Sequence, residues 1–132
     1  MREWAGKRYW LIGASEGLGR SLAIAMSKTG CQLVLSARNE ERLTALANEL
    51  PGRAEVKPLD VGDAAAVEQA GAELGEIDGM IYLAGVYWPI DAKAWDTAQA
   101  EAMCDINMMG AIRSVGAVLP AMLSRGSGHI VL

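Results

Sequence analysis

Short apolar runs alternate along this chain with longer segments in which apolar residues recur three and four positions apart. The runs are typical of buried strands and cover residues 8–12, 32–37, 54–59, 79–83 and 129–132. The longer segments have the periodicity of helices and cover residues 18–29, 40–50, 64–74 and about 95–124. Strands that alternate with helices of this length run parallel, and right-handed crossovers place the helices on both faces of the sheet. The alternation therefore predicts a doubly wound α/β fold with three layers, α-β-α.

Length and composition indicate one folded unit. A chain of 132 residues with 52% hydrophobic content can bury roughly two-thirds of the surface that it exposes when unfolded. Glycine and proline mark the ends of the helical segments, and no internal repeat or low-complexity linker divides the chain. We therefore expect residues 1–132 to form a single domain. Because the sequence ends on the apolar "GHIVL", inside the fifth strand, we expect it to be the N-terminal part of a longer chain.

The charge pattern argues against a nucleic-acid partner. The chain has 12 basic and 16 acidic residues, a net charge of -4 and no basic stripe. Its cysteines, Cys31 and Cys104, lie far apart without a Cys-x-x-Cys pair, which predicts buried thiols and no metal site. The N-terminus lacks an apolar signal core, and no apolar run approaches the ~20 residues of a membrane helix. We expect a cytoplasmic protein that binds small molecules and neither nucleic acid nor membrane.

The segment between the first strand and the first helix, "GASEGLG", contains three glycines, Gly13, Gly17 and Gly19. A turn without side chains lets the backbone approach a pyrophosphate, while the following helix presents unpaired N–H groups and the positive end of its dipole. A structural alternative is that Gly13 serves only a tight turn and Gly19 only close packing of helix on strand. The position of the segment inside a β-α-β unit favours the phosphate site.

Further motifs follow in order along nearly the whole chain. "SARN" ends the second strand, "LDV" the third and "YLAG" the fourth; "IN" lies in the long helix, and "LPAMLSRGSGHIVL" leads into the fifth strand. Together with "GASEGLG", these motifs resemble those of the short-chain dehydrogenase/reductase family. The resemblance implies a Rossmann-like sheet with strand order 3-2-1-4-5. It also implies a nicotinamide dinucleotide as cofactor and hydride transfer between that cofactor and a small carbonyl or alcohol substrate.

The resemblance assigns roles to individual residues. Those that it places on the cofactor are Gly13, Ser15, Gly17, Leu18, Gly19, Arg38, Asp60, Val61, Ala84 and Gly85. It implies that the Asp60 carboxylate accepts a hydrogen bond from the adenine amino group; the alternative is that Asp60 caps the helix that begins near Asp63. It implies that Asn107 is a catalytic residue that holds a water in the proton relay; the alternative is a solvent-facing polar residue. No set of metal ligands surrounds the single histidine, His129.

The end of the second strand bears on the choice between NADP and NAD. Arg38 follows Ala37, the position where relatives that use NAD carry an acidic residue for the ribose hydroxyls. The Arg38 guanidinium can meet a 2′-phosphate with two hydrogen bonds, and Ser15 can add a hydroxyl donor. Glu16 argues the other way, because relatives that prefer NADP often carry a basic residue there, and Arg38 has the alternative of being a solvated strand end. We expect NADP, with NAD as the less favoured cofactor.

The chain departs from the family pattern in two respects. Ile12 and Leu83 replace a threonine and an asparagine, and we expect them to face each other across the first and fourth strands, with apolar contact in place of a hydrogen bond. The catalytic serine and the Tyr-x-x-x-Lys pair of the family are absent from these 132 residues. None of Tyr9, Tyr82 and Tyr87 has a lysine four residues later. We therefore expect the 132-residue chain to show no turnover by itself.

Three kinds of function are compatible with these residues. The first is the NADP(H)-binding part of a short-chain oxidoreductase, which the ordered motifs favour. The second is a non-catalytic nucleotide-binding or interaction module on the same fold, which the missing tyrosine and lysine favour. The third, a methyltransferase or flavoprotein, is disfavoured by the combination of Arg38, Asp60 and Asn107.

The fifth strand and the long helix predict self-association. An apolar strand with an unpaired edge recruits other strands. The long helix, which Pro120 is expected to kink or end, would expose some of its apolar side chains, with the candidates Met103, Ile106, Val115, Leu119 and Met122. A symmetric pairing would cover both surfaces. We therefore expect a homo-oligomer that associates through this side and not through the edge at 54–59.

Overall fold

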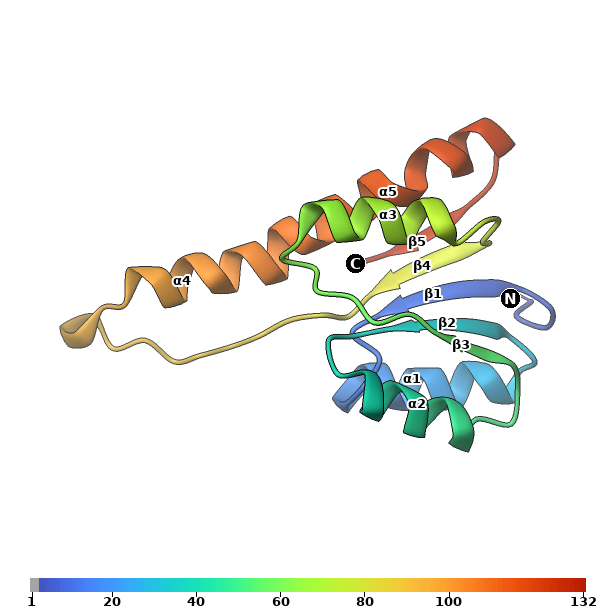
Figure 1. Cartoon of the computed structure of the whole chain (residues 1–132), viewed down its shortest axis with the longest axis horizontal. Helices are drawn as coiled ribbons and strands as arrows, with labels where there is room; N and C mark the ends of the chain where they lie inside the picture. The colour runs from blue at the N-terminus through green and yellow to red at the C-terminus, as the bar shows by residue number, and fades with distance from the viewer. Residues whose placement is uncertain (1–2) are drawn as a thin grey trace.

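One parallel sheet of five strands runs through the centre of the molecule (Figure 1). The computed structural model describes residues 3–132, and its strands are β1 (Arg8–Ile12), β2 (Gln32–Ser36), β3 (Ala54–Val56), β4 (Gly79–Tyr82) and β5 (His129–Val131). Their order in the sheet is β3-β2-β1-β4-β5, and every neighbouring pair is parallel. The predicted doubly wound fold and its strand order are confirmed.

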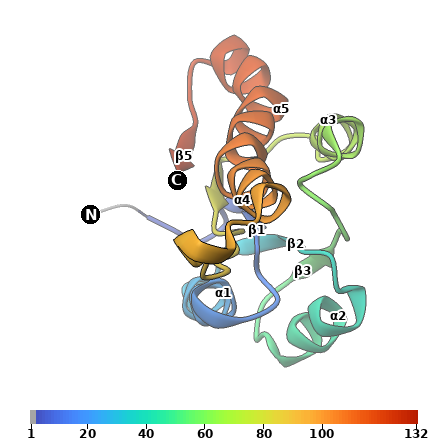
Figure 2. The ribbon, with the colours of Figure 1, turned by 90° about the vertical axis from the view of Figure 1, so that its left-hand side faces the viewer.

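Helices cover both faces of this sheet. The helices α1 (Gly17–Lys28) and α2 (Glu40–Glu49) lie on one face, and α3 (Ala64–Glu73) and α5 (Gly110–Arg125) lie on the other, as Figure 1 and Figure 2 show from two sides. The helix α4 (Thr97–Cys104) projects beyond the sheet and contains no buried residue. The core therefore has two parts, one on each face of the strands.

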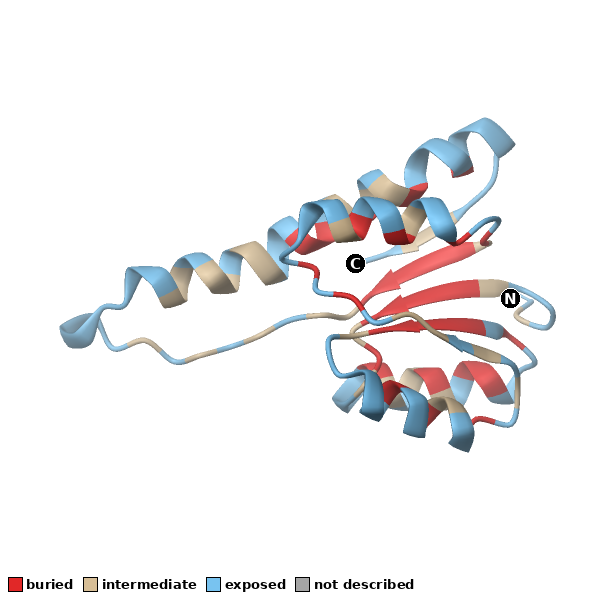
Figure 3. Cartoon of the chain, in the orientation of Figure 1, coloured by how far each residue is buried: buried red, intermediate tan, exposed pale blue. Residues whose placement is uncertain are grey.

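Strand β1 lies in the middle of the sheet, and its side chains alternate between the two parts of the core. Tyr9 and Leu11 belong to the cluster that includes α1 and α2, whereas Trp10 and Ile12 belong to the cluster that includes α3 and α5. None of these four residues is more than 1% exposed, and Figure 3 shows the strand as buried except at its N-terminal end. Because both faces of the strand are covered, its residues from Tyr9 to Ile12 form an unbroken apolar and aromatic run, and only Arg8 at its start is charged.

Strand β3 ends at Val56, before the predicted end at residue 59. The chain continues beside β2, where the Lys57 amide donates to the Leu35 carbonyl at 2.9 Å. The Leu59 amide donates to the Ala37 carbonyl at 3.0 Å. Pro58 lies between these two donors and has no N–H to add to a ladder, so the pairing loses its regular form there.

The predicted long helix is divided by an irregular turn. A 3-10 turn at Ala92–Ala94 precedes α4, and a π-helical turn at Asp105–Met109 separates α4 from α5. In this wide turn the Gly110 N–H donates to the Asp105 carbonyl, five residues earlier, instead of the carbonyl four residues earlier as in an α-helix. Pro120 lies inside α5 and does not end it. The α-helical hydrogen bonding is therefore interrupted at the π turn.

The helical stretch Thr97–Arg125 corrects one sequence prediction. By length and composition its 29 residues are apolar enough to cross a membrane, whereas the sequence analysis predicts no such segment. Core helices of water-soluble proteins reach the same length and hydropathy. Here Ser114 and Val118 are buried, and Gly71 of α3 lies against the backbone of Ala117. One face of the C-terminal half of the stretch therefore packs on the fold.

The two cysteines differ in exposure. Cys31 is buried, and desolvation together with the charge of Asp78 raises the pKa of its thiol to about 11. Cys104 is exposed, so the prediction of two buried thiols is wrong for this residue. Its exposure follows from the position of α4 beyond the edge of the sheet.

The turn from β1 into α1 is held between β2 and β4. The amides of Gly13 and Ala14 donate to the Ser36 carbonyl at 2.7 and 3.2 Å. Gly13 has a φ of 93°, and a Cβ at this residue would overlap the backbone of Ala84, which follows β4. A Cβ at Gly19 would overlap the Gly13 carbonyl in the same way. Glycine is the residue that permits both this φ and this close approach.

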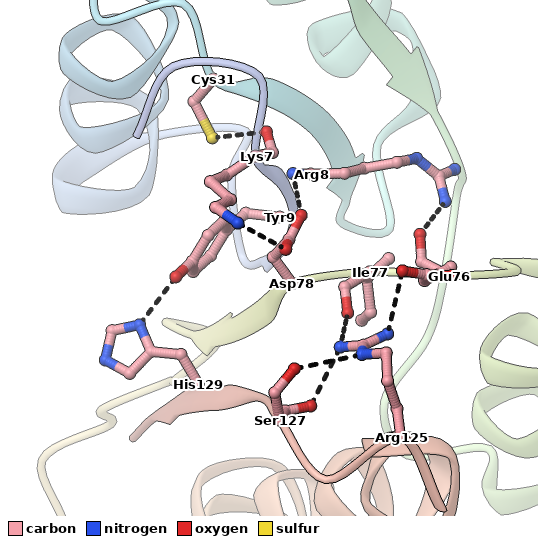
Figure 4. A network of polar contacts seen from close by, with 10 residues as sticks. All are labelled: Lys7, Arg8, Tyr9, Cys31, Glu76, Ile77, Asp78, Arg125, Ser127 and His129. Carbon is pink, nitrogen blue, oxygen red and sulfur yellow. Dashed lines mark hydrogen bonds and ion pairs between the residues drawn. The ribbon is translucent and has the colours of Figure 1, made fainter. Parts of the chain in front are cut away.

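A polar network links β1, β4 and β5 at the end of the sheet where these strands begin, away from the glycine turn (Figure 4). The Asp78 carboxylate accepts hydrogen bonds from the Arg8 amide at 2.9 Å and from the Lys7 ammonium at 3.3 Å. The backbone carbonyl of Asp78 accepts from the His129 amide at 3.0 Å. The bond from the Arg8 amide, with the Lys7 charge, holds the pKa of the Asp78 carboxyl below its usual range. Asp78 thus joins β1, β4 and β5.

We predict that the free energy of unfolding falls less at acidic pH in Asp78→Asn than in the wild type. A carboxyl whose pKa is lower in the folded than in the unfolded chain stabilises the fold above its usual pKa of about 4. This contribution is lost as the pH falls through the lower, folded pKa. Urea unfolding from about pH 7 to about pH 2 should therefore show a smaller fall in the free energy of unfolding for the variant. Parallel curves for the two proteins would contradict the prediction.

We predict that Gly13→Ala lowers the free energy of unfolding by more than about 2 kcal/mol, because the new Cβ meets backbone atoms at a φ that other residues rarely adopt. Gly116→Ala is the matched control. Gly116 lies in α5, and a Cβ there meets no atom within 4 Å. That exchange should stabilise the protein by about 0.5–1 kcal/mol. If Gly13→Ala unfolds in urea like the wild type, the turn is not constrained as described.

Candidate functional site

A cleft of about 710 Å³ opens at the carboxyl ends of the strands, between the turn after β1 and the segment after β4. The chain leaves these two neighbouring strands toward opposite faces of the sheet, and such a point forms the ligand crevice of open α/β sheets. The cleft is lined by all ten residues that the sequence analysis places on a cofactor: Gly13, Ser15, Gly17, Leu18, Gly19, Arg38, Asp60, Val61, Ala84 and Gly85. The structure brings them together; their contact with a cofactor stays a prediction.

The first turn of α1 borders the cleft, and its amides have no side-chain cap. Glu16 is the N-cap residue, but its side chain makes no hydrogen bond to the first turn. In contrast, the helices α2, α3 and α4 are each capped by a side chain that accepts from an amide, namely Asn39, Asp63 and Asp96. Uncapped amides and the positive end of the helix dipole attract an anion. This corner of the cleft therefore suits a phosphate group.

Apolar surface lies beside the uncapped start of α1. Leu18 lies between Gly17 and Gly19 in the first turn of α1 and is 73% exposed. Ile12, Ala37 and Leu59 add further apolar surface to the cleft. Within residues 3–132, no group of three or more His, Cys, Asp or Glu side chains could hold a metal ion. The combination of apolar walls with a few polar groups fits an anionic organic ligand.

Two arginines and one carboxylate lie where β2 meets the cleft. Arg38 is exposed and has no ion pair among the residues that the structure describes. Arg42 also lines the cleft, and its Nη1 lies 2.8 Å from Oε2 of Glu16. Asn39, the cap of α2, is a further lining residue. Sequence reasoning missed Arg42 and Asn39; Asn39 caps α2 and Arg42 lies in its first turn, two positions that follow Arg38 closely in the sequence.

The loop after β3 carries Asp60 and Val61 to the cleft. The Asp60 Oδ1 accepts from the Gly62 amide at 2.9 Å, while α3 is capped by Asp63. The alternative role of Asp60 as the helix cap is therefore wrong. Arg113 of α5 holds the loop from the other side, because it donates to the Val61 carbonyl at 3.1 Å. The same guanidinium donates to Asp105 Oδ1 at 2.7 Å and holds the pKa of that carboxyl below its usual range.

The segment after β4 forms the other wall of the cleft and is tied to the π turn. Asn107 Oδ1 accepts from the Val86 amide at 2.7 Å, and Asn107 Nδ2 donates to the Val86 carbonyl at 2.8 Å. Asn107 is exposed, as its alternative role as a solvent-facing polar residue requires, but its side chain is bonded to Val86, and it does not line the cleft. Its part in a proton relay stays a prediction. Val86 and Ile106 do line the cleft and were missed, because no residue-type signal marks apolar positions as part of a site.

Ile12 and Leu83 do not pack against each other as expected. The Leu83 amide donates to the Ile12 carbonyl at 2.7 Å. Their side chains belong to different parts of the core, Ile12 with α3 and α5 and Leu83 with α1 and α2. Because Ile12 pairs with Tyr82 in the sheet, the next residue along β4 points to the opposite face.

Comparison with known proteins places the chain in a family. The family model described as short chain dehydrogenase matches residues 7–132. An uncharacterized oxidoreductase of Staphylococcus saprophyticus is 33% identical in an alignment of 129 positions that covers 92% of this chain and 55% of that protein. The structure of serine dehydrogenase from Escherichia coli has a TM-score of 0.86 and 30% identity, over 93% of this chain and 59% of the other.

A metagenomic short-chain oxidoreductase, solved in complex with NADP, has a TM-score of 0.89 and 28% identity over 98% of this chain and 62% of the other. The chain thus spans just over half the length of the staphylococcal relative and about three-fifths of these structures. Because the family match covers residues 7–132 and the cleft contains the glycine turn typical of that family, the protein belongs to the short-chain dehydrogenase/reductase family.

Proposed function

We propose that this chain is the dinucleotide-binding part of an oxidoreductase and that it binds NADP(H) in the cleft. The observation that carries the proposal is the uncapped start of α1 below a glycine turn in which a Cβ at Gly13 or Gly19 would overlap backbone atoms. When bound, the nicotinamide would supply hydride chemistry with a small carbonyl or alcohol. The residues of this chain would bind and orient the cofactor.

The proposed contacts follow from the walls of the cleft. The amides at the start of α1 would hold the pyrophosphate. The Asp60 carboxylate would accept from the adenine amino group, in a loop that the bond from Arg113 to Val61 keeps in place. One amide hydrogen and one lone-pair site of the Asn107 side chain are not used by Val86, so they could hold a relay water.

The charges at the end of β2 support NADP over NAD. Arg38 has no anionic partner within residues 3–132, so its guanidinium is free to pair with a 2′-phosphate. Glu16, which on sequence grounds disfavours a phosphate, is paired with Arg42 at 2.8 Å, and this partner offsets its charge. The metagenomic relative that was solved with NADP has the same fold over 98% of this chain.

A non-catalytic nucleotide-binding module is the second candidate. Tyr9 and Tyr82 are buried and hydrogen-bonded within the fold, and Tyr87 is 81% exposed beyond β4. None of the three has a lysine four residues later. The described residues thus contain no tyrosine–lysine pair that could exchange a proton with a substrate.

We further propose that the chain forms a homo-oligomer through β5 and α5. The exposed apolar side chains in and next to these two elements are those of Met108, Met109, Ile112, Leu119, Leu123, Val131 and Leu132. The set differs from the sequence expectation, because Met122 is buried and Ile106 and Val115 pack partly into the core. In the described part of the chain β5 is an edge strand, and an exposed apolar edge favours pairing.

We predict that Arg38→Ala weakens NADPH binding about tenfold to hundredfold and leaves NADH binding within about twofold, because a hydrogen-bonded charge pair contributes about 1.5–3 kcal/mol. Calorimetric titration measures both affinities. Arg53→Ala is the matched control, since Arg53 is exposed and precedes β3 at the other end of the sheet. An unchanged ratio of the two affinities in Arg38→Ala would show that Arg38 does not discriminate.

We predict no reductase turnover by the 132-residue chain, because a missing general acid lowers such rates by about a hundredfold to ten-thousandfold. The assay follows NADPH oxidation at 340 nm with panels of aldehydes and ketones, on a preparation of confirmed mass. Robust oxidation of NADPH would contradict the prediction and would favour a proton donor outside the Tyr-x-x-x-Lys pattern.

We predict that light scattering shows more than one chain per particle and that Leu123→Glu or Val131→Asp shifts the protein toward the monomer, because each places a charge in an apolar contact. Leu18→Glu is the control, because Leu18 is as exposed as Leu123, at 73% and 70%, but lies at the cleft and outside the proposed contact. It should leave the assembly unchanged. A folded monomer at high concentration would refute the proposed assembly.

A further inference from the structure

The π turn at Asp105–Met109 has a specific partner on the sheet. Tyr82, at the end of β4, donates its phenol O–H to the Ile106 carbonyl at 2.6 Å. The side chain is only 7% exposed. Burial raises the pKa of Tyr82 to about 12, so the phenol keeps its proton and remains a donor near neutral pH. A turn of this kind in the middle of a helix often marks a functional site.

Gly110 makes room for this hydrogen bond. A Cβ at Gly110 would overlap the Tyr82 hydroxyl and would lie 3.0 Å from Cγ2 of Val61. The N–H of the same glycine closes the π turn on the Asp105 carbonyl. Tyr82 and Gly110 therefore act as a pair, in which the small residue lets the large one reach the turn.

The π turn in turn fixes one wall of the cleft. Asn107 follows Ile106 directly, and both polar atoms of its side chain bond to the Val86 backbone. A Cβ at the neighbouring Gly85 would lie 3.3 Å from Asn107 Oδ1, so this segment is in close contact with the asparagine. Gly85, Val86 and Ile106 all line the cleft. A chain of contacts thus runs from the Tyr82 phenol to the cleft wall after β4.

We propose that Tyr82 is a positioning residue for the part of the cleft after β4: it holds the Ile106 carbonyl and thereby orients Asn107 and the backbone at Val86. The inference rests on the proposed binding of a dinucleotide. Such folds hold the two nucleotide halves on opposite sides of the point between β1 and β4. Arg38 and Asp60 lie on the adenosine side, so Tyr82 acts on the nicotinamide side.

The test replaces Tyr82 by phenylalanine, which removes one oxygen and keeps the ring. Calorimetry compares NADPH with adenosine 2′,5′-bisphosphate, which contains only the adenosine half. We expect Tyr82→Phe to weaken NADPH binding about three- to tenfold, the effect of one hydrogen bond, and to leave the half-ligand within about twofold. A general loss of stability would lower both affinities together.

Tyr9→Phe is the matched control. Tyr9 is also buried, and its phenol is hydrogen-bonded to His129 Nδ1 at 2.9 Å, at the end of the sheet away from the cleft. Figure 4 shows this pair. Tyr9→Phe should leave both affinities unchanged even if it lowers the melting temperature. Loss of NADPH affinity in both variants to the same degree would overturn the assignment of Tyr82.

Hydrogen exchange tests the inference without any ligand. In Tyr82→Phe the amide of Val86 should exchange about tenfold faster, because its acceptor Asn107 is less firmly held, whereas in Tyr9→Phe it should keep its protection. Gly110→Ala, whose methyl displaces the phenol, should reproduce the pattern and add little to Tyr82→Phe in the double variant. Unchanged exchange at Val86 overturns the inference. Wild-type protein that binds neither ligand overturns the proposed function instead, and the exchange result still decides whether Tyr82 positions the turn.

Discussion

The contact between the turn after β1 and the end of β4 sets the geometry on which the rest of the cleft depends. Gly13 lies against the backbone of Ala84 at a positive φ, so no side chain separates the two segments where they diverge to opposite faces of the sheet. The crevice between them has the start of α1 on one side and residues 84–86 on the other. Because the crevice arises from the path of the backbone, backbone amides are its most strictly placed polar groups.

Side chains of the sheet and helix layers hold the loops around this crevice. Arg113 donates to the Val61 carbonyl, and Tyr82 donates to the Ile106 carbonyl. Asn107 bonds to both backbone groups of Val86. Each contact joins residues that are far apart in the sequence, so the loops keep a defined shape without regular secondary structure. A site that is ordered before binding loses less conformational entropy when a ligand arrives.

The sequence predicts those features whose cause is local. Strand β1 is covered on both faces and is therefore apolar after its first residue, Arg8, and the spacing of the glycines follows from the backbone of one turn. The π turn was not predictable, because it depends on the fit between Tyr82 and Gly110, which meet only in the folded chain. The pair of Glu16 with Arg42 has the same origin. Cys104 was placed wrongly because helical periodicity does not reveal that α4 lies beyond the sheet.

Binding of a pyrophosphate by the first amides of α1 is tested most directly by titrating nitrogen-15-labelled protein with NADPH and following the amide chemical shifts. The largest changes are predicted at residues 17–19, with further changes at Arg38 and at Val86 on the two sides of the cleft. The amides near Asp78, at the opposite end of the sheet, should not move. Changes concentrated away from the cleft, or none at millimolar NADPH, would contradict the proposed binding site.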